Sequence, residues 1–302
     1  SLNWSFTVVA DIARWRNLMS TKTPELISDT NLSHAWGRAL LATMERSKKD
    51  MTPLTVSIGG FKDCLPQEDF RIRKVLDSAL TEFDGFNCDV SASVIFPYKH
   101  WRRGGRPSSS ELFDWYLNQF LPRLKARDPR NRNGTYFERM IAFQGVKQVH
   151  GRPEILTKNQ LEHIISDWHR DREHPRRPRQ SALQVACFDP AKDHTGQSVR
   201  GFPCLQQVSF TYDDDNGLAV NAYYPTQYIF DRAYGNYLGL CHLGHFMASE
   251  LGLILVRLNC FIGHPELGSI RKSQLHELSE HVREILHNID THGASGRESA
   301  TA

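Results

Sequence analysis

The chain has 302 residues, of which 40% are hydrophobic and 24% are charged, and its net charge is +3 with neutral histidines. These values are typical of an ordinary globular protein, and a charge this mild does not by itself indicate a nucleic-acid or membrane protein. No apolar run approaches the roughly 18 residues that a membrane span needs. The six cysteines are scattered without a CxxC pair, so the sequence predicts a reducing, cytoplasmic location.

In the first half of the chain, Leu32, Trp36 and Leu40 recur near helical spacing and predict a helix over 32–44. Residues 52–60 and 90–98 look like strands around a helical segment at 68–83. A loop rich in Gly, Pro and Ser follows, and Ser110 then looks like the N-cap of another helix.

The second half has a clearer order of elements. Leu161, Ile164, Ile165 and Trp168 form one apolar helix face, with Thr157 as a plausible start signal, and a basic loop follows at 172–180. Strands are then predicted at 181–188, 205–212 and 217–224, the last two joined by an Asn-Gly turn that favours a hairpin.

A long apolar helix is predicted from Ile229 to Leu251, and a final one over 273–289. Glycine weakens a helix, so Gly235, Gly239 and Gly244 indicate close packing, with a sheet as the expected neighbour. Residues 1–290 are predicted to form a single domain and 291–302 a disordered tail.

This order of helix, arginine loop, Pro-Cys strand, hairpin and buried helix resembles the thymidylate synthase family, which includes the pyrimidine nucleotide hydroxymethylases. The matching pieces are "NQLEHIISDWHRD", "PRRPR", "ACFDP", "FPCLQQVSFTY" and "YGNYLGLCHLGHFMA". They fall between Gly134 and Gly268, which is under half of the chain. The resemblance implies an α+β fold, a mixed sheet packed on a long buried helix, a symmetric dimer and a divergent N-terminal half.

The resemblance also implies roles for single residues. Cys204 matches the nucleophile that adds to C6 of a pyrimidine, and Tyr136 matches a tyrosine near the reacting base. Asn236 matches the asparagine that pairs with the pyrimidine edge; an amide can read both O4 and N3–H of uracil, which favours uracil over cytosine. The phosphate-gripping arginines, which the family takes from the partner subunit, match Arg176, Arg177 and Arg179. Other expected substrate contacts are Asp189, Ser209 and His264.

Several family contacts are replaced in this sequence. Pro225 stands for a phosphate arginine, Tyr228 for the aspartate that binds the folate pterin, and Leu205 for the histidine after Pro-Cys. In "GHPELG", only Gly263 remains of the family's sugar-binding motif. Ordinary thymidylate synthesis is therefore not expected, and a role in specialised metabolism or nucleotide modification fits better.

The resulting expectation is a methyltransferase or hydroxymethyltransferase that acts at C5 of a pyrimidine nucleotide or nucleoside derivative, with 5,10-methylenetetrahydrofolate as the expected donor. Two alternatives stay open. The chain could be a nucleotide-binding protein of the same fold without catalysis, or the arginine loops could bind nucleic acid, which is the weaker of the two. For His242 and His245, packing is favoured over a metal site because no third ligand is evident.

Overall fold

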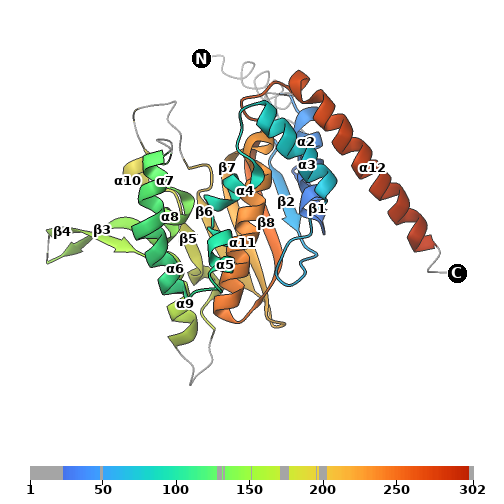
Figure 1. The fold of residues 1–302 in the computed structure, drawn as a ribbon. Helices are drawn as coiled ribbons and strands as arrows, with labels where there is room; N and C mark the ends of the chain where they lie inside the picture. The colour runs from blue at the N-terminus through green and yellow to red at the C-terminus, as the bar shows by residue number, and fades with distance from the viewer. Residues whose placement is uncertain are drawn as a thin grey trace, which may run out of the picture.

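The computed structural model describes residues 23–47, 50–127, 131, 133–150, 152–170, 177–194, 196 and 203–298 (Figure 1). The helices are α2 (Leu32–Glu45), α3 (Phe70–Glu82), α4 (Cys88–Ser93), α5 (Tyr98–Arg103), α6 (Ser109–Trp115), α7 (Leu121–Arg127), α8 (Tyr136–Ile141), α9 (Gln160–Arg170), α10 (Pro190–Asp193), α11 (Tyr234–Leu251) and α12 (His276–Glu298). Within the described ranges, no helix is both long and apolar enough to cross a membrane.

The core of the molecule is a six-stranded mixed sheet with the order β1-β2-β8-β7-β6-β5. Its strands are β1 (Glu25–Asp29), β2 (Leu54–Ile58), β5 (Gln184–Ala186), β6 (Gln207–Tyr212), β7 (Gly217–Tyr228) and β8 (Ile254–Glu266). The β1–β2 and β7–β8 pairs are parallel and the other pairs are antiparallel. The predicted α+β class with a mixed sheet is confirmed, as is the hairpin between β6 and β7, where Asn216 takes a φ of 64°.

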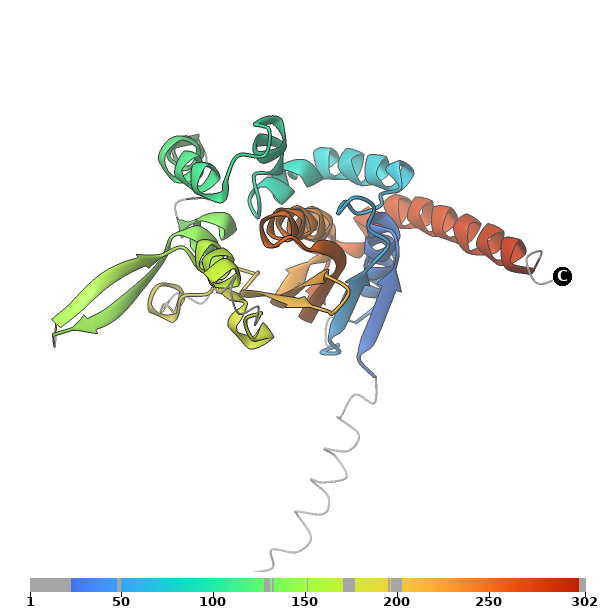
Figure 2. The same ribbon diagram turned by 90° about the horizontal axis from the view of Figure 1, so that it is seen from below.

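Helix α11 lies across one face of the sheet and is buried along almost its whole length (Figure 2). Its glycines allow close approach on two sides. A Cβ at Gly244 would lie 2.7 Å from Val220 of β7, as expected for packing on a sheet. A Cβ at Gly235 or Gly239, in contrast, would collide with α4, so these two glycines pack against a helix and not against the sheet.

Helices α2, α3, α4 and α12 complete the layer on the α11 side of the sheet, and α5–α9 extend it beyond β5 and β6 (Figures 1 and 2). A second, two-stranded sheet, β3 (Phe143–Val149) and β4 (Arg152–Lys158), projects from this end as a hairpin. The opposite face of the main sheet, here called the outer face, has no described helix over it (Figure 2).

Three expected boundaries differ from the structure. Residues 90–98 were expected to be a strand, but α4 occupies 88–93 because Asn87 caps it by accepting from the Val90 amide at 2.9 Å. The N-cap expected at Ser110 is Ser108, which forms a capping box with Glu111. The helix expected to start near Thr157 starts at Gln160, because Thr157 belongs to β4 and Asn159 accepts from the Glu162 amide.

Helix α12 extends beyond residue 289, where the sequence predicts its end. Helix α12 continues to Glu298. The Thr291 hydroxyl donates to the carbonyls of His287 and Asn288, which keeps its polar group satisfied within the helix. Extending an existing helix costs little because nucleation has already been accomplished.

Candidate functional site

Cys204 lies just before β6, in a pocket of about 910 Å³. The walls come from the start of α11, the end of β7, helix α4 and the segment that leads into α8. The lining includes the apolar side chains Phe86, Val90, Val94 and Leu124 and the polar or charged side chains Ser91, Arg127, Tyr136, Arg139, Cys204, Gln227, Tyr228, Arg232 and Asn236. A concave site that combines an apolar wall with convergent polar and charged groups is suited to a polar small molecule.

Tyr136 holds the segment that carries Cys204. It is the first residue of α8, whose start is fixed by the Thr135–Glu138 capping box. The Tyr136 hydroxyl accepts from the amides of Cys204 at 3.2 Å and Leu205 at 3.4 Å, and it also hydrogen-bonds to the Cys204 side chain. Burial, with the nearby Cys204, raises the pKa of Tyr136, so the phenol keeps its proton and can donate it to the sulfur.

The pKa of the Cys204 thiol is raised. Burial is the main cause and Glu266 adds to it, whereas the charge of Arg232 and the hydrogen bond from Tyr136 lower it. The thiol is therefore neutral at pH 7, and Arg232 and Tyr136 are the groups that would stabilise a thiolate at this position.

Arg232 was not expected from the sequence. It lies in the π-helical turn η4 (Ile229–Ala233) that connects β7 to α11, and its guanidinium lies 5.3 Å from the centroid of the Phe86 ring. Arg232 and Arg127 both line the pocket with exposed side chains. The guanidinium of Arg139, in contrast, forms an ion pair with Asp193 at 2.6 Å and donates to the carbonyls of Cys187 and Asn133.

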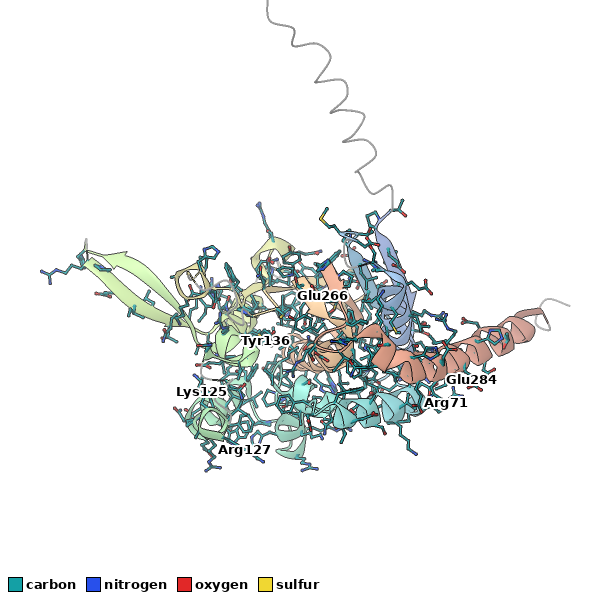
Figure 3. All side chains as sticks on the ribbon, turned by 90° about the horizontal axis from the view of Figure 1, so that it is seen from above. Arg71, Lys125, Arg127, Tyr136, Glu266 and Glu284 are labelled. Carbon is teal, nitrogen blue, oxygen red and sulfur yellow. The ribbon has the colours of Figure 1, made fainter. Side chains whose placement is uncertain are left out.

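Three of the predicted site residues, Cys204, Tyr136 and Asn236, lie in this one pocket. Asn236 is in the first turn of α11 and is 5% exposed. Glu266, the carboxylate whose charge acts on Cys204, lies at the end of β8 and is labelled with Tyr136 in Figure 3. The ring of His264, also on β8, is 3.2 Å from Glu266.

The other predicted residues lie elsewhere. Arg177 donates to the Asp213 carbonyl and to Asn216, so it holds the β6–β7 turn, and neither Arg177 nor Arg179 lines the Cys204 pocket. Asp189 caps α10 and borders an adjacent, polar pocket. Ser209 is paired with Asn221 on the outer face of the sheet. Arg176 lies outside the described residues.

His242 and His245 belong to an aromatic cluster away from the pocket. The His242 ring stacks on Tyr98 at 3.9 Å, and His245 lies 3.3 Å from the Tyr98 hydroxyl. Burial lowers the pKa of His242 to about 3 and that of His245 to about 4. Across the described ranges, no group of three or more His, Cys, Asp or Glu side chains could hold a metal.

Gln227, Ser91 and Arg127 were also missed by the sequence reasoning. Gln227 stands at the end of β7, directly before Tyr228. The alternating pattern of the strand does not distinguish Gln227 as a site residue. Ser91 lies in the helix that was expected to be a strand. No protein-family model matches this chain, and no curated protein matches its sequence.

Proposed function

We propose that this chain is an enzyme with a thymidylate synthase-like fold that acts at C5 of a pyrimidine nucleotide or nucleoside derivative, with Cys204 as its nucleophile. One observation carries the proposal. Tyr136, Cys204 and Asn236 were selected from three separate segments by the order of motifs, and all three line one pocket. The hydrogen bonds from the Cys204 and Leu205 amides to the Tyr136 hydroxyl hold the tyrosine beside the proposed nucleophile.

The proposed reaction starts when the Cys204 thiolate adds to C6, forming a C–S bond and moving the ring's electron pair toward C5 and the C4 carbonyl. The nucleophilic C5 then forms a bond to the carbon of an electrophilic one-carbon donor, and the bond between that carbon and its carrier breaks with the electron pair left on the carrier. Loss of the C5 proton to a base and expulsion of the thiolate restore the ring, so the cysteine ends unchanged. Tyr136 and Arg232 stabilise the negative charge on sulfur before addition and after release.

Two arginine side chains of the pocket are suited to bind an anionic group of the substrate. Arg127 and Arg232 line the pocket from α7 and from the β7–α11 connection, and both are exposed. Guanidinium groups match phosphate oxygens in geometry and charge. Arg177 and Arg179, two of the loop arginines expected from the sequence, do not line this pocket within the chain.

Methylenetetrahydrofolate fits the pocket only in part. The apolar wall of Phe86, Val90 and Val94 could cover a flat pterin ring. Tyr228, which lines the pocket where the family has a pterin-binding aspartate, has no carboxylate to offer. The residues present therefore do not fit this cofactor, and the proposed transfer of a methyl or hydroxymethyl group to C5 does not depend on it.

A homodimer is part of the proposal and is supported by the outer face. Leu26, Thr55, Phe261 and Tyr223 are neighbours in register across β1, β2, β8 and β7. Leu26 is 67%, Phe261 47% and Tyr223 45% exposed, which is unusual for a row in the middle of a sheet. An exposed apolar row of this kind marks an interaction surface.

A second candidate is a nucleotide-binding protein that has lost catalysis. The raised pKa of Cys204 favours it, because the neutral thiol is a poor nucleophile. Both candidates require the pocket to bind a pyrimidine nucleotide, and they differ in whether Cys204 adds to it.

Exchange of the C5 hydrogen tests the proposal without any one-carbon donor. Addition of sulfur to C6 makes C5 basic, so the C5 hydrogen of a bound substrate should exchange with deuterium from D2O. We expect loss of the C5–H NMR signal from at least one of UMP, dUMP, CMP and dCMP. Cys204→Ser should abolish this exchange, at least 100-fold.

Cys64→Ser is the matched control, because Cys64 and Cys204 are the two cysteines that are not fully buried. It should leave exchange unchanged. Cys64 accepts from the Leu255 amide near the first residue of β8, whereas Glu266 is the last residue of that strand. Nucleotide binding without exchange in the parent protein would instead support the binding-only candidate.

A further inference from the structure

One arginine joins helix α8 to the chain that leaves β5. The Arg139 guanidinium donates to both oxygens of Asp193, at 2.6 and 2.9 Å, and to the Cys187 carbonyl at 2.8 Å. Its side chain is 12% exposed and that of Asp193 is 6% exposed. A two-pronged hydrogen bond between an arginine and a carboxylate fixes distance and angle together, so this contact is directional as well as strong.

A second tie lies beside the first. Gln160, the first residue of α9, donates from Nε2 to the carbonyls of Arg139 at 3.0 Å and Ala186 at 2.8 Å. Its Oε1 accepts from the Ala186 amide at 2.8 Å. The Gln160 amide thus bonds to main-chain groups of both α8 and β5. Ala186 and Cys187 are consecutive, so both ties end at the same point of the chain.

That point is bonded in turn to the segment that carries Cys204. The Cys187 amide donates to the Gln206 carbonyl at 2.8 Å, and Gln206 lies two residues after Cys204. On α8, Tyr136 lies one turn before Arg139, and its hydroxyl accepts from the Cys204 amide. Two routes therefore join α8 to the Cys204 segment, one through Tyr136 itself and one through Arg139, Cys187 and Gln206.

Helix α8 needs such ties to keep its position. It has six residues, fewer than the roughly 12–15 at which an isolated helix becomes stable, and the projecting β3–β4 hairpin follows it (Figure 2). Phe137, Met140 and Ile141 hold it on the core, but apolar burial is not directional. A small slide that such packing tolerates would stretch the hydrogen bond of 3.2 Å between Tyr136 and the Cys204 amide beyond its normal range.

We infer that Arg139 and Gln160 are positioning residues, which fix α8 against the end of β5 and thereby hold the Tyr136 hydroxyl on the Cys204 segment. This inference deepens the proposed function, in which Cys204 is the nucleophile. Tyr136 touches the reacting group, whereas Arg139 and Gln160 act through it. Their loss should withdraw the hydrogen-bond donor that favours the thiolate.

The test is the pH profile of Cys204 alkylation by iodoacetamide in the full chain, followed by mass spectrometry. Tyr136→Phe sets the reference and should react about tenfold more slowly at pH 8, because the thiol then ionises about one pH unit higher. Arg139→Lys keeps a cation beside Asp193 without the fork, and Gln160→Met keeps the size of the side chain without its amide. Each should slow alkylation by about three- to tenfold at pH 8, with a smaller deficit toward pH 10 as the thiol ionises.

Double variants separate positioning from a general loosening of the fold. If Arg139 and Gln160 act through Tyr136, then adding either substitution to Tyr136→Phe should slow alkylation no further. Arg232, Glu266 and Tyr228, which also interact electrostatically with the Cys204 thiol, are unchanged in all of these proteins.

Arg46→Lys is the matched control. Arg46 is 8% exposed and, like Arg139, it pairs with a carboxylate, that of Glu25, and donates to a main-chain carbonyl, that of Thr52. It lies at the end of α2 and does not line the Cys204 pocket. Its substitution should leave the alkylation profile unchanged.

Parent-like alkylation in both Arg139→Lys and Gln160→Met, or losses that add to that of Tyr136→Phe, would overturn the inference. If Arg139→Lys does not fold, Gln160→Met decides, because it leaves the ion pair with Asp193 intact. The proposed function fails separately: a parent protein without C5 exchange would overturn it, whereas the alkylation profiles would still report whether Tyr136 is held in place.

Discussion

Opposing charges act on the sulfur of Cys204. Burial raises the pKa of the thiol, Arg232 lowers it and Glu266 raises it. Arg232 and Glu266 come from different elements, the β7–α11 connection and the end of β8, so each can be changed separately. Removing the charge of Arg232 should therefore lower the reactivity of Cys204, and removing the charge of Glu266 should raise it.

We expect Arg232→Gln to slow alkylation of Cys204 by iodoacetamide at pH 8 by roughly three- to tenfold, because the thiol pKa rises further. Glu266→Gln should accelerate it, because the pKa falls. In the parent the rate should rise with pH, as the thiolate forms only above the usual thiol pKa. The measurement is the labelling rate from pH 7 to 10 by mass spectrometry, with Cys64 as the internal reference; equal rates in both variants would contradict the assignment.

The order of motifs selected Cys204, Tyr136 and Asn236 by their match to family positions, and these three residues line one pocket. It did not locate the cations. Arg177 stacks on Trp168 and Tyr212 and holds a turn, whereas Arg232 and Arg127 come from segments without a motif. Gln227 accepts a hydrogen bond from Tyr237, and that contact requires the packing of α11 on the sheet, which no local pattern in the sequence predicts.

At the scale of elements, α4 forms one wall of the pocket and is positioned by α11. A Cβ at Gly235 would lie 2.4 Å from the Ser91 Cβ and 2.8 Å from the Cys88 carbonyl oxygen.

Gly235→Ala should therefore push α4 away, cost about 1–3 kcal/mol of unfolding free energy and weaken nucleotide binding. The control is Gly145→Ala on β3, where nothing lies within 4 Å, and it should leave both unchanged. The measurements are chemical denaturation and calorimetry; a Gly235→Ala protein with parent stability would contradict this packing argument.

Strand β8 shows why part of the fold was not predicted. It lies between β2 and β7 in the sheet, yet its sequence ends in "GHPE", which was matched to a sugar-binding motif and not to a strand. Its partner β2 lies some 200 residues earlier, and such distant pairing leaves no local pattern. The β6–β7 hairpin was predicted correctly because its Asn-Gly turn is local.

The whole molecule should assemble through its outer face. Phe261→Arg places a charge in the exposed row of Leu26, Phe261 and Tyr223, and a charge buried in an apolar interface is strongly unfavourable. We expect the parent to sediment as a dimer, at twice the 34.6 kDa of one chain, and this variant as a monomer. Phe70→Arg is the control: Phe70 is 76% exposed but lies on α3, on the other side of the sheet. A monomeric parent, or a dimer that survives Phe261→Arg, would contradict this arrangement.

The projecting β3–β4 hairpin separates Tyr136 from Cys204 along the chain but not in space. Within the described part of the chain its strands pair only with each other, and every residue of β4 is exposed. A peptide bond broken in β4 would therefore leave the six-stranded sheet and the pocket walls joined by their own packing. The result would be a nicked protein whose nucleophile and tyrosine belong to different polypeptides, and the two fragments could be produced separately and recombined.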